Sequence, residues 1–379
     1  MAQVSLAVAE DRRADGQVNI AVSRHHSLDG LEALWRGLEP EVPGLSFFRS
    51  WSWVGCLIEE RFPDPLVLKA MQGGRLMGLA LFNRRGGRLC LGESGDAALD
   101  APFVEHNGPL TLGTPDIGRA LLQAAVDTRG IRRLILGGVP AEVLALAPGI
   151  ALRRQERLAP RLDLEAVRAA GGDPLARLSA NARQQIRRSA RRYGRLALRR
   201  AETVPEALAV FAEMVELHGR SWRARGKPGA FASPFMRRFH EALIARAMPR
   251  GEVDLLRIEG DGGLVGILYN FRLGGRVSAY QSGFDLAGAG PHGKPGLTCH
   301  SLAIARAAEA GEAVYDFLGG ADRYKLTLAQ ESEALFWAEM VPARSIEGLG
   351  VRAMEFLRHP GLAARRRGSS SEGDGSGRA

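Results

Sequence analysis

An internal repeat constrains the fold of this chain more than any other feature of its sequence. Residues 74–89 read GRLMGLALFNRRGGRL, and residues 262–277 read GGLVGILYNFRLGGRV. At a constant offset of 188 residues the two segments share several identities, among them Gly78 with Gly266 and Arg84 with Arg272. Each copy is a series of apolar stretches separated by glycine turns, which is typical of hairpin-connected strands. Both copies therefore predict a β-meander of three strands.

The segments around the meander repeat in the same order. Two helices are expected before each meander, over 27–38 and 47–62 in the first copy and over 205–225 and 233–248 in the second. After each meander a helix, over 114–129 or 297–311, leads into a strand that ends in Leu-Gly-Gly. The sequence therefore predicts an α/β fold that arose by duplication, with the order α-α-β-β-β-α-β in each half. We expect domains over 1–164 and 205–362, a basic helical linker over 165–204, and a disordered Gly/Ser-rich tail over 363–379.

The composition agrees with a globular chain of two domains. The protein has 379 residues, of which 45% are hydrophobic and 25% charged, unlike a disordered chain. Its three cysteines are far apart and form no CxxC pair, which fits a reducing compartment. No apolar run approaches the roughly 20 residues that span a bilayer. The N-terminus combines a short apolar run with mixed charge, unlike a secretory signal. These features lead us to expect a cytoplasmic protein. No HExxH, EF-hand or Walker pattern is present, so the sequence does not predict a metal site or a nucleotide-hydrolysis site.

The positive charge is concentrated in one segment. The chain has 51 basic and 42 acidic residues, with a formal net charge of +9, and residues 177–200 hold nine arginines and no acid. If Ser179 caps a helix there, Arg183, Arg187, Arg191 and Arg195 line one face of it. Such a face can bind an anionic acceptor, an anionic membrane surface or tRNA, or it can simply be a solvated helix paired with acids elsewhere.

The order of elements resembles the GNAT N-acetyltransferase fold, used here twice. The second half is similar to the CelD or BioF2-like acyltransferase family, which is related to the Fem aminoacyltransferases. The matching motifs are LSANARQQIRRSARR at 178–192, LHGRSWRARGKPGAF at 217–231, AYQSGFD at 279–285 and YDFLGGADRYK at 315–325. The resemblance implies an acyltransferase that uses acetyl-CoA or another acyl-CoA as donor. The first half shares it only through the duplication.

The resemblance also implies where the donor lies. In a GNAT domain the fourth strand, here 276–284, splays from the fifth, and the donor pyrophosphate lies on the N-terminus of the next helix. In the loop before that helix, glycines allow close approach to phosphates and a lysine adds positive charge; these residues are Gly290, Gly293, Lys294 and Gly296. The usual pyrophosphate signature of the GNAT fold is an Arg or Gln followed by GxGx(G/A), and this loop does not reproduce it. A glycine-rich surface loop without a ligand is therefore the alternative. The matching segment 93–113 of the first half holds four acids and no Lys or Arg. Because this segment would repel pyrophosphate, we expect the first half to be a degenerate copy that shapes the substrate cleft, and only the second half to bind the donor.

The chemistry is expected just after the fifth strand of the second half. A carboxylate and a cation there can deprotonate an attacking amine and stabilise the oxyanion. Asp316 and Lys325 are candidates for these roles, and Tyr324 is a candidate proton donor to the leaving thiolate. For each, a purely structural role is the alternative. Arg187, Arg191, Arg220 and Trp222 are candidates for binding the acceptor.

The leading hypothesis is direct transfer from acyl-CoA to nitrogen or oxygen, because no Cys or Ser stands in a nucleophile motif. The acceptor is expected to be an anionic small molecule or a glycan precursor of the cell envelope or of an exopolysaccharide, and contact with an anionic membrane is compatible with the arginine segment. Two alternatives stay open: a Fem-like transferase that takes its donor from aminoacyl-tRNA, and an inactive double-GNAT scaffold that binds an anionic partner.

Overall fold

The computed structural model describes residues 17–24, 27–101, 104–320 and 322–358. Residues 1–16 and the tail at 363–379 lie outside these ranges. Among the helices of the described part, none combines the length and the apolar character that crossing a bilayer requires.

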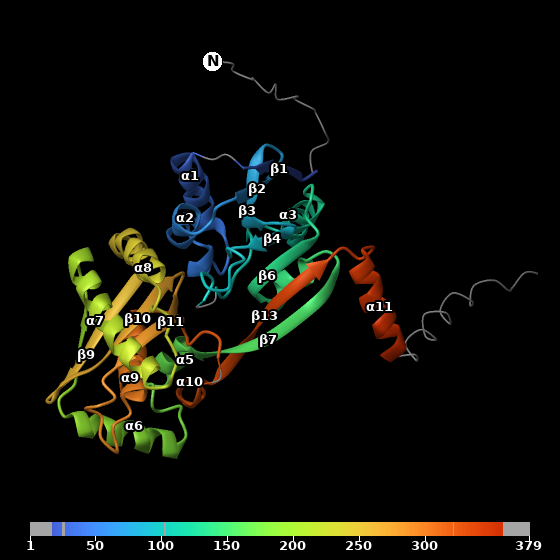
Figure 1. Cartoon of the computed structure of the whole chain (residues 1–379). Helices are drawn as coiled ribbons and strands as arrows, with labels where there is room; N and C mark the ends of the chain where they lie inside the picture. The colour runs from blue at the N-terminus through green and yellow to red at the C-terminus, as the bar shows by residue number, and fades with distance from the viewer. Residues whose placement is uncertain (1–16, 25–26, 102–103, 321, 359–379) are drawn as a thin grey trace, which may run out of the picture.

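The first half has the predicted order of elements (Figure 1). Two helices come first, α1 (Leu28–Leu38) and α2 (Trp51–Glu60). The meander follows as β2 (Pro65–Gln72), β3 (Arg75–Arg85) and β4 (Arg88–Leu91), and then α3 (Pro115–Asp127) leads into β6 (Arg133–Pro140). Elements that the sequence did not predict are β1 (Asn19–Ser23), β5 (Leu110–Thr111), α4 (Ala141–Leu146) and the long strand β7 (Ile150–Asp163).

The second half repeats this order. Helices α7 (Val204–Arg223) and α8 (Pro234–Ala247) precede the meander β9 (Val253–Gly260), β10 (Gly263–Leu273) and β11 (Arg276–Phe284). Helix α9 (Pro295–Glu309) then leads into the short strand β12 (Val314–Asp316). The half ends with α10 (Arg323–Leu328), β13 (Glu331–Val341) and α11 (Ile346–Arg358).

Glycines set the register of the meanders. Gly274 and Gly275 lie between β10 and β11 with φ angles of 58° and 77°. Positive φ at both central residues is the geometry of the two-residue turn that matches the twist of a hairpin, and glycine adopts it without strain. The turn pairs Leu273 with Arg276 and thereby fixes which β11 side chains face each side of the sheet.

All the major strands form one continuous sheet across both halves. Its order is β1-β2-β3-β4-β6-β13-β7-β12-β11-β10-β9-β8, with β8 spanning Ala197–Arg200. The last strands of the halves are exchanged: β13 pairs with β6 of the first half, and β7 pairs with β12 of the second. β7 and β13 also pair with each other and run side by side between the halves (Figure 1). The halves therefore share their sheet.

The halves also share a hydrophobic core. Helices α2 and α8 pack together, and the core around them takes residues from both halves. Phe47 stacks on Phe271 with ring centroids 4.1 Å apart, and Trp53 lies edge-on to Phe239 at 5.5 Å. Burying such large aromatic side chains contributes strongly to stability, so separation of the halves is costly.

The segment 165–204 packs on the second half. It contains α5 (Leu164–Ala169, beginning one residue earlier), α6 (Ala180–Tyr193) and β8. Ser179 is the N-cap of α6, as predicted, and accepts a hydrogen bond from the Ala182 N–H. The helix ends at Tyr193 and Gly194 follows with a φ of 71°, so Arg195 lies outside the helix and the predicted arginine face is one residue shorter. Helix α6 packs against α9, and β8 pairs with β9.

Candidate active site

Strands β11 and β12 separate soon after they meet. They pair in parallel only over 276–278 and 314–316, whereas β11 continues to Phe284. The separation expected between the fourth and fifth strands of the second half is therefore present. Past the last pair, the β11 residues Ala279 to Ser282 and Phe284 line a cavity of about 1050 Å³. On the far side the cavity is closed by α9, α10 and the turn between β12 and α10.

One end of the cavity is formed by the N-terminus of α9. Lys294, Gly296 and Leu297 line it. The first turn of a helix has N–H groups without an intrahelical partner, and they attract anions. Helix α6 holds this turn in place, because the buried Ser189 hydroxyl accepts from the Lys294 N–H at 2.8 Å and contacts the Thr298 hydroxyl at 2.7 Å.

The two other glycines predicted for donor binding shape the loop instead of lining the cavity. Gly290 has a φ of 64°, which glycine adopts readily. A Cβ on Gly293 would lie 2.1 Å from the carbonyl oxygen of Ala289 and 2.8 Å from the Tyr193 hydroxyl oxygen. Gly293 is therefore required for packing of the loop. Of the predicted donor residues, the structure brings Lys294 and Gly296 to the cavity wall.

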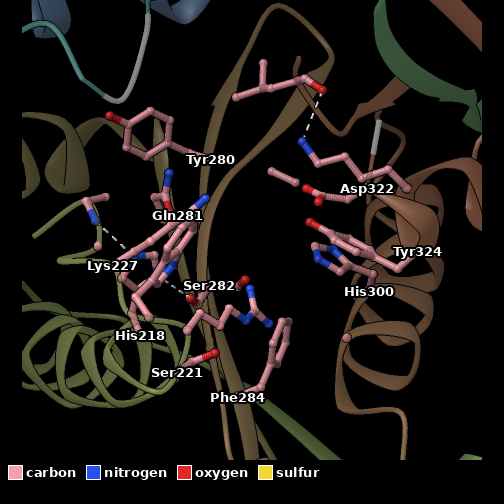
Figure 2. A pocket seen from close by; sticks show the side chains of 18 of the residues that line it. His218, Ser221, Lys227, Tyr280, Gln281, Ser282, Phe284, His300, Asp322 and Tyr324 are labelled. Carbon is pink, nitrogen blue, oxygen red and sulfur yellow. Dashed lines mark hydrogen bonds between the residues drawn. The ribbon is translucent and has the colours of Figure 1, made fainter. Parts of the chain in front are cut away.

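Tyr324 and His300 form one wall of the cavity. Their rings stack with centroids 5.2 Å apart and an interplanar angle of 16°, and Figure 2 shows them side by side, across the β11 residues from His218 and Lys227. Burial raises the pKa of Tyr324, so its phenol stays protonated. Burial, with the nearby Lys325 cation, lowers the pKa of His300 to about 3, so its ring is neutral. His300 Nδ1 lies 2.9 Å from the Tyr315 hydroxyl.

Lys325 lies on α10, next to the turn that follows β12. Its side chain is buried, and Nζ donates to the main-chain oxygens of Gly319 at 3.0 Å and Leu318 at 3.3 Å. Burial lowers the pKa of the ammonium, while Glu105, Asp322 and Asp316 act in the opposite direction. The structure thus places the predicted cation, with its charge directed at a peptide group, in the cavity wall.

Asp316 does not line the cavity. It is fully buried at the end of β12, where its Oδ2 lies 2.7 Å from His106 Nε2 and 2.6 Å from Arg276 Nη1. Its Oδ1 accepts from the Leu318 N–H at 2.8 Å. Burial alone would raise its pKa, but His106 and Arg276 lower it to about 2. These contacts occupy the carboxylate that the sequence suggested as a base, so Asp316 is placed to hold the turn rather than to touch substrate.

A carboxylate from the first half reaches the cavity wall instead. Glu105 lies between β4 and α3 in sequence, yet it lines the cavity and accepts a hydrogen bond from the Gly319 N–H. Sequence reasoning missed this residue, because the acids of 93–113 were considered only as a barrier to pyrophosphate. The signal was the repeat itself, which aligns this segment with the donor loop of the second half.

The candidate acceptor residues separate into two groups. Trp222 lines the cavity, with Arg225 Cζ and Lys227 Nζ each 5.8 Å from its ring. His218 lies beside it. Its Nδ1 is hydrogen-bonded to the Ser282 carbonyl oxygen, and its Nε2 accepts a hydrogen bond from the Ala230 N–H. The remaining candidates, Arg187, Arg191 and Arg220, are exposed and stand outside the cavity lining.

In the first half, the corresponding gap between strands is filled by the chain itself. Strands β4 and β6 pair in parallel as far as Leu91 and Leu136. Beyond them, Asn107 Nδ2 donates to the carbonyl oxygens of Leu91 at 2.7 Å and Gly137 at 3.0 Å. Asn107 therefore bridges the two strand ends where a donor would lie in the second half.

No three His, Cys, Asp or Glu side chains of the described residues are grouped to hold a metal ion.

Comparisons with known proteins agree with this architecture. A family model described as an acetyltransferase (GNAT) domain matches residues 180–326. The crystal structure of FemX superposes with a TM-score of 0.55 at 10% sequence identity, over 86% of this chain and 100% of that chain. No curated protein matches the chain in sequence.

Two further solved structures are similar at lower TM-scores. A tandem GNAT protein from the clavulanic acid biosynthesis pathway has 13% identity and a TM-score of 0.46, over 85% of this chain and 98% of that chain. The C-terminal domain of a putative lysylphosphatidylglycerol synthetase from Agrobacterium fabrum has 14% identity and a TM-score of 0.47, over 74% of this chain and 85% of that chain. The domain match and the repeated topology show a mixed α/β fold of two GNAT domains. Identities this low concern the fold alone.

Proposed function

We propose that the second half transfers an acyl group directly from an acyl-CoA to a nitrogen or oxygen acceptor. The observation that carries this proposal is the gap between β11 and β12, where one edge of β11 from Ala279 to Phe284 faces a large cavity. An exposed strand edge offers N–H and C=O groups in the spacing that an extended chain of amides can pair with. The pantetheine arm of CoA is such a chain.

The ends of the cavity suit the two ends of the donor. The pyrophosphate lies at the start of α9, where the N–H groups of Gly296 and Leu297 and the ammonium of Lys294 line the wall. The thioester then lies further along β11, between Tyr280 and the Tyr324 and Lys325 wall. Gly290 and Gly293 contribute by shaping the loop that positions α9.

Two side chains support the chemical step. The Lys325 ammonium stabilises negative charge that develops on the thioester oxygen, directly or through the Gly319 peptide that it contacts. Tyr324, whose pKa is raised by burial, keeps a proton that the departing thiolate can accept. Asp316 is a positioning residue in this assignment, because it anchors the Leu318 N–H, the His106 imidazole and the Arg276 guanidinium behind the turn.

The acceptor enters beside Trp222. The cations Arg225 and Lys227 stand over its ring there, which favours an anionic acceptor such as a phosphorylated glycan precursor of the cell envelope. The exposed Arg187, Arg191 and Arg220 extend positive charge over the outer surface and can bind the remote part of such an acceptor or an anionic membrane.

Ligand-dependent melting tests the donor class. Acetyl-CoA is expected to raise the melting temperature, and the chain is expected to release free CoA thiol when an amine is added. CoA without the acyl group should also stabilise the protein, since the phosphates and the pantetheine are retained. Stabilisation by charged tRNA and not by acetyl-CoA would instead identify an aminoacyl transferase. Stabilisation by neither, with no thiol release, would leave the binding scaffold.

A further inference from the structure

We propose that Glu105, supplied by the first half, is the general base of the transfer site in the second half. The inference rests on the proposed acyl transfer and adds the group that removes the acceptor proton. It also gives the first half a catalytic role beyond shaping the cavity.

The contacts of Glu105 place its carboxylate beside the chemistry. The side chain crosses the boundary between the halves, lines the cavity, and accepts the Gly319 N–H. Lys325 binds the carbonyl oxygen of the same residue at 3.0 Å. Lys325 also binds the carbonyl oxygen of Leu318 at 3.3 Å, which belongs to the same peptide unit as the Gly319 N–H. Base and cation therefore contact opposite sides of the Leu318–Gly319 peptide unit.

Backbone strain marks the same place. Within the part of the chain that the structure describes, the non-glycine residues with positive φ are His106, at 48°, and Leu318, at 58°. They are the immediate neighbours of Glu105 and Gly319. Such conformations cost roughly 1–3 kcal/mol each and persist where the surrounding structure enforces them, often at functional sites. The hydrogen bond between Gly319 and Glu105 is therefore flanked by one strained residue from each half.

The charges around Glu105 suit a base at neutral pH. Burial raises its pKa to about 7, and the nearby Asp316 carboxylate adds to the rise. The hydrogen bond from the Gly319 N–H, the Lys325 ammonium and His106 act in the opposite direction. Burial raises the pKa of Tyr280 on β11, and the Glu105 carboxylate adds to that rise. A carboxylate that gains a proton near neutral pH is a stronger base than an ordinary surface glutamate, and it is still ionised in part at pH 7.

The other acids and imidazoles of the cavity wall are less suited. Asp322 is exposed at the N-cap of α10. His218 has both ring nitrogens engaged. His300 has a pKa of about 3, because burial disfavours its charged form, and so it is a weak base.

The transfer step balances with these groups. Glu105 takes the proton from the acceptor N–H or O–H, and the freed electron pair forms the new bond to the thioester carbonyl carbon. Negative charge moves to the carbonyl oxygen near Lys325 and returns as the C–S bond breaks. The electron pair of that bond leaves with sulfur, and the thiolate takes a proton from Tyr324. Tyr324 is then reprotonated, and Glu105 deprotonated, through solvent.

The test compares Glu105→Gln with the wild-type chain in acetyl-CoA turnover. Thiol release is followed from pH 5.5 to 9 with water alone and with a simple primary amine as acceptor, and acetyl-CoA affinity is measured separately by calorimetry. The wild-type rate should rise with pH through about 7, since the ionised carboxylate is the active form. Glu105→Gln keeps an acceptor for the Gly319 N–H, so affinity should stay within about twofold while kcat falls about 10²-fold or more and the rise near pH 7 disappears.

Two further variants keep the result decisive. Glu93→Gln removes another buried carboxyl of the same segment, one outside the cavity lining, and should keep the rise near pH 7. Glu105→Ala should regain activity when formate is added, because a free carboxylate can occupy the vacated space. If Glu105→Gln misfolds, the formate effect decides the question.

Three results would overturn the proposal. One is Glu105→Gln with wild-type kcat and an unchanged pH profile. Another is Glu105→Ala that formate does not rescue. The third is a wild-type chain that binds acetyl-CoA but releases no thiol to water or amine. A wild-type chain that does not bind acetyl-CoA would contradict the proposed function itself.

Discussion

His106 and Asp316 join the two halves of the molecule, with Nε2 of the imidazole 2.7 Å from Oδ2 of the carboxylate. His106 comes from the first half, between β4 and β5, and Asp316 ends β12 of the second half. Arg276 on β11 contacts the same carboxylate at 2.6 Å. The pair holds Glu105, the neighbour of His106, against the turn at Gly319 that Lys325 contacts from α10, and so the geometry of the cavity wall depends on it.

Asp316→Asn should destabilise the fold. Removing one partner of a buried ion pair typically costs about 3–5 kcal/mol, because the remaining charge is left uncompensated. Urea unfolding at pH 7 measures the change in the free energy of unfolding. Asp96→Asn, which removes an exposed partner of Arg85, is the matched control and should change it little. A stable Asp316→Asn protein with lost turnover would instead make Asp316 catalytic.

The Asp316 carboxylate should also make the stability of the fold depend on pH in acid solution. The folded pKa of Asp316 is about 2, below the ordinary value of 3.8, because His106 and Arg276 outweigh the effect of burial. The ionised form is thus favoured by folding, and its contribution to stability is complete above about pH 4 and is lost as the pH falls towards 2. In His106→Gln this part of the pH dependence should shrink. Stability that is independent of pH between 4 and 2 would contradict the assignment.

Glu93 should have the opposite pH dependence. Burial, with the nearby Asp100, raises its pKa from 4.5 to about 8. Folding therefore favours the protonated form, and stability should fall as the pH rises from about 4.5 to about 8, by a few kcal/mol in total. Glu93→Gln should stabilise the protein at pH 8.5 and have little effect at pH 4.5. Chemical unfolding at both pH values checks this, and equal effects at both would contradict it.

The order of elements could be predicted because it is encoded locally. Glycine turns such as Gly274-Gly275 and the periodicity of the helices do not depend on distant partners. The exchanged strand β7 was missed because its sequence, IALRRQERLAPRLD, contains many charges and a proline that disfavour a strand assignment. Its extended conformation depends on contacts with β13. Arg154 lies over the ring of Phe336 at 4.3 Å, and Arg157 lies over the ring of Trp337 at 4.9 Å.

Only the site residues that belong to the second half could be predicted from the sequence. Tyr324 and Lys325 follow the fifth strand in sequence, so a strand-end argument finds them. Glu105 depends on a contact between segments far apart in the chain, and local patterns carry no information about it. Asp316 was assigned by its place in a motif, but burial and its contacts with His106 and Arg276, which the sequence does not reveal, give it another environment.

Gly296→Asp should weaken binding of the donor. A Cβ on Gly296 would make ordinary contacts, with the Phe284 ring 3.6 Å away, so the loop can tolerate a side chain there. The added carboxylate would stand at the start of α9, where we place the pyrophosphate, and repel it. Calorimetry with acetyl-CoA should show a loss of affinity of about tenfold or more.

Gly262→Asp is the control for this change, because its Cβ would point into open space at a turn of the second half. Affinity should be unchanged there. Gly293 is a poorer probe than Gly296, since any side chain at Gly293 collides with the Ala289 carbonyl oxygen. Wild-type affinity in Gly296→Asp would place the phosphates elsewhere.

Replacing Arg187 and Arg191 by Ser should leave the melting temperature nearly unchanged. Both side chains are exposed on α6, and single exposed charges contribute little to stability. Binding to vesicles that contain anionic lipid should weaken, with a loss that shrinks as salt is added. Ser replacements of Arg153 and Arg199, which are exposed elsewhere, test whether position or total charge matters. A large fall in melting temperature with unchanged vesicle binding would assign the two α6 arginines to the fold.

Lys325→Met should lower kcat by about 10²-fold or more, because it removes an ammonium next to developing negative charge. Acetyl-CoA affinity should change little, since the phosphates lie at α9. Steady-state kinetics and calorimetry separate the two quantities. Lys325→Arg should recover little activity, because the buried Nζ is held between the carbonyl oxygens of Leu318 and Gly319 and a guanidinium needs more room. Full activity of Lys325→Met would reduce the lysine to a structural tie for the turn, and its effect would then be confined to the melting temperature.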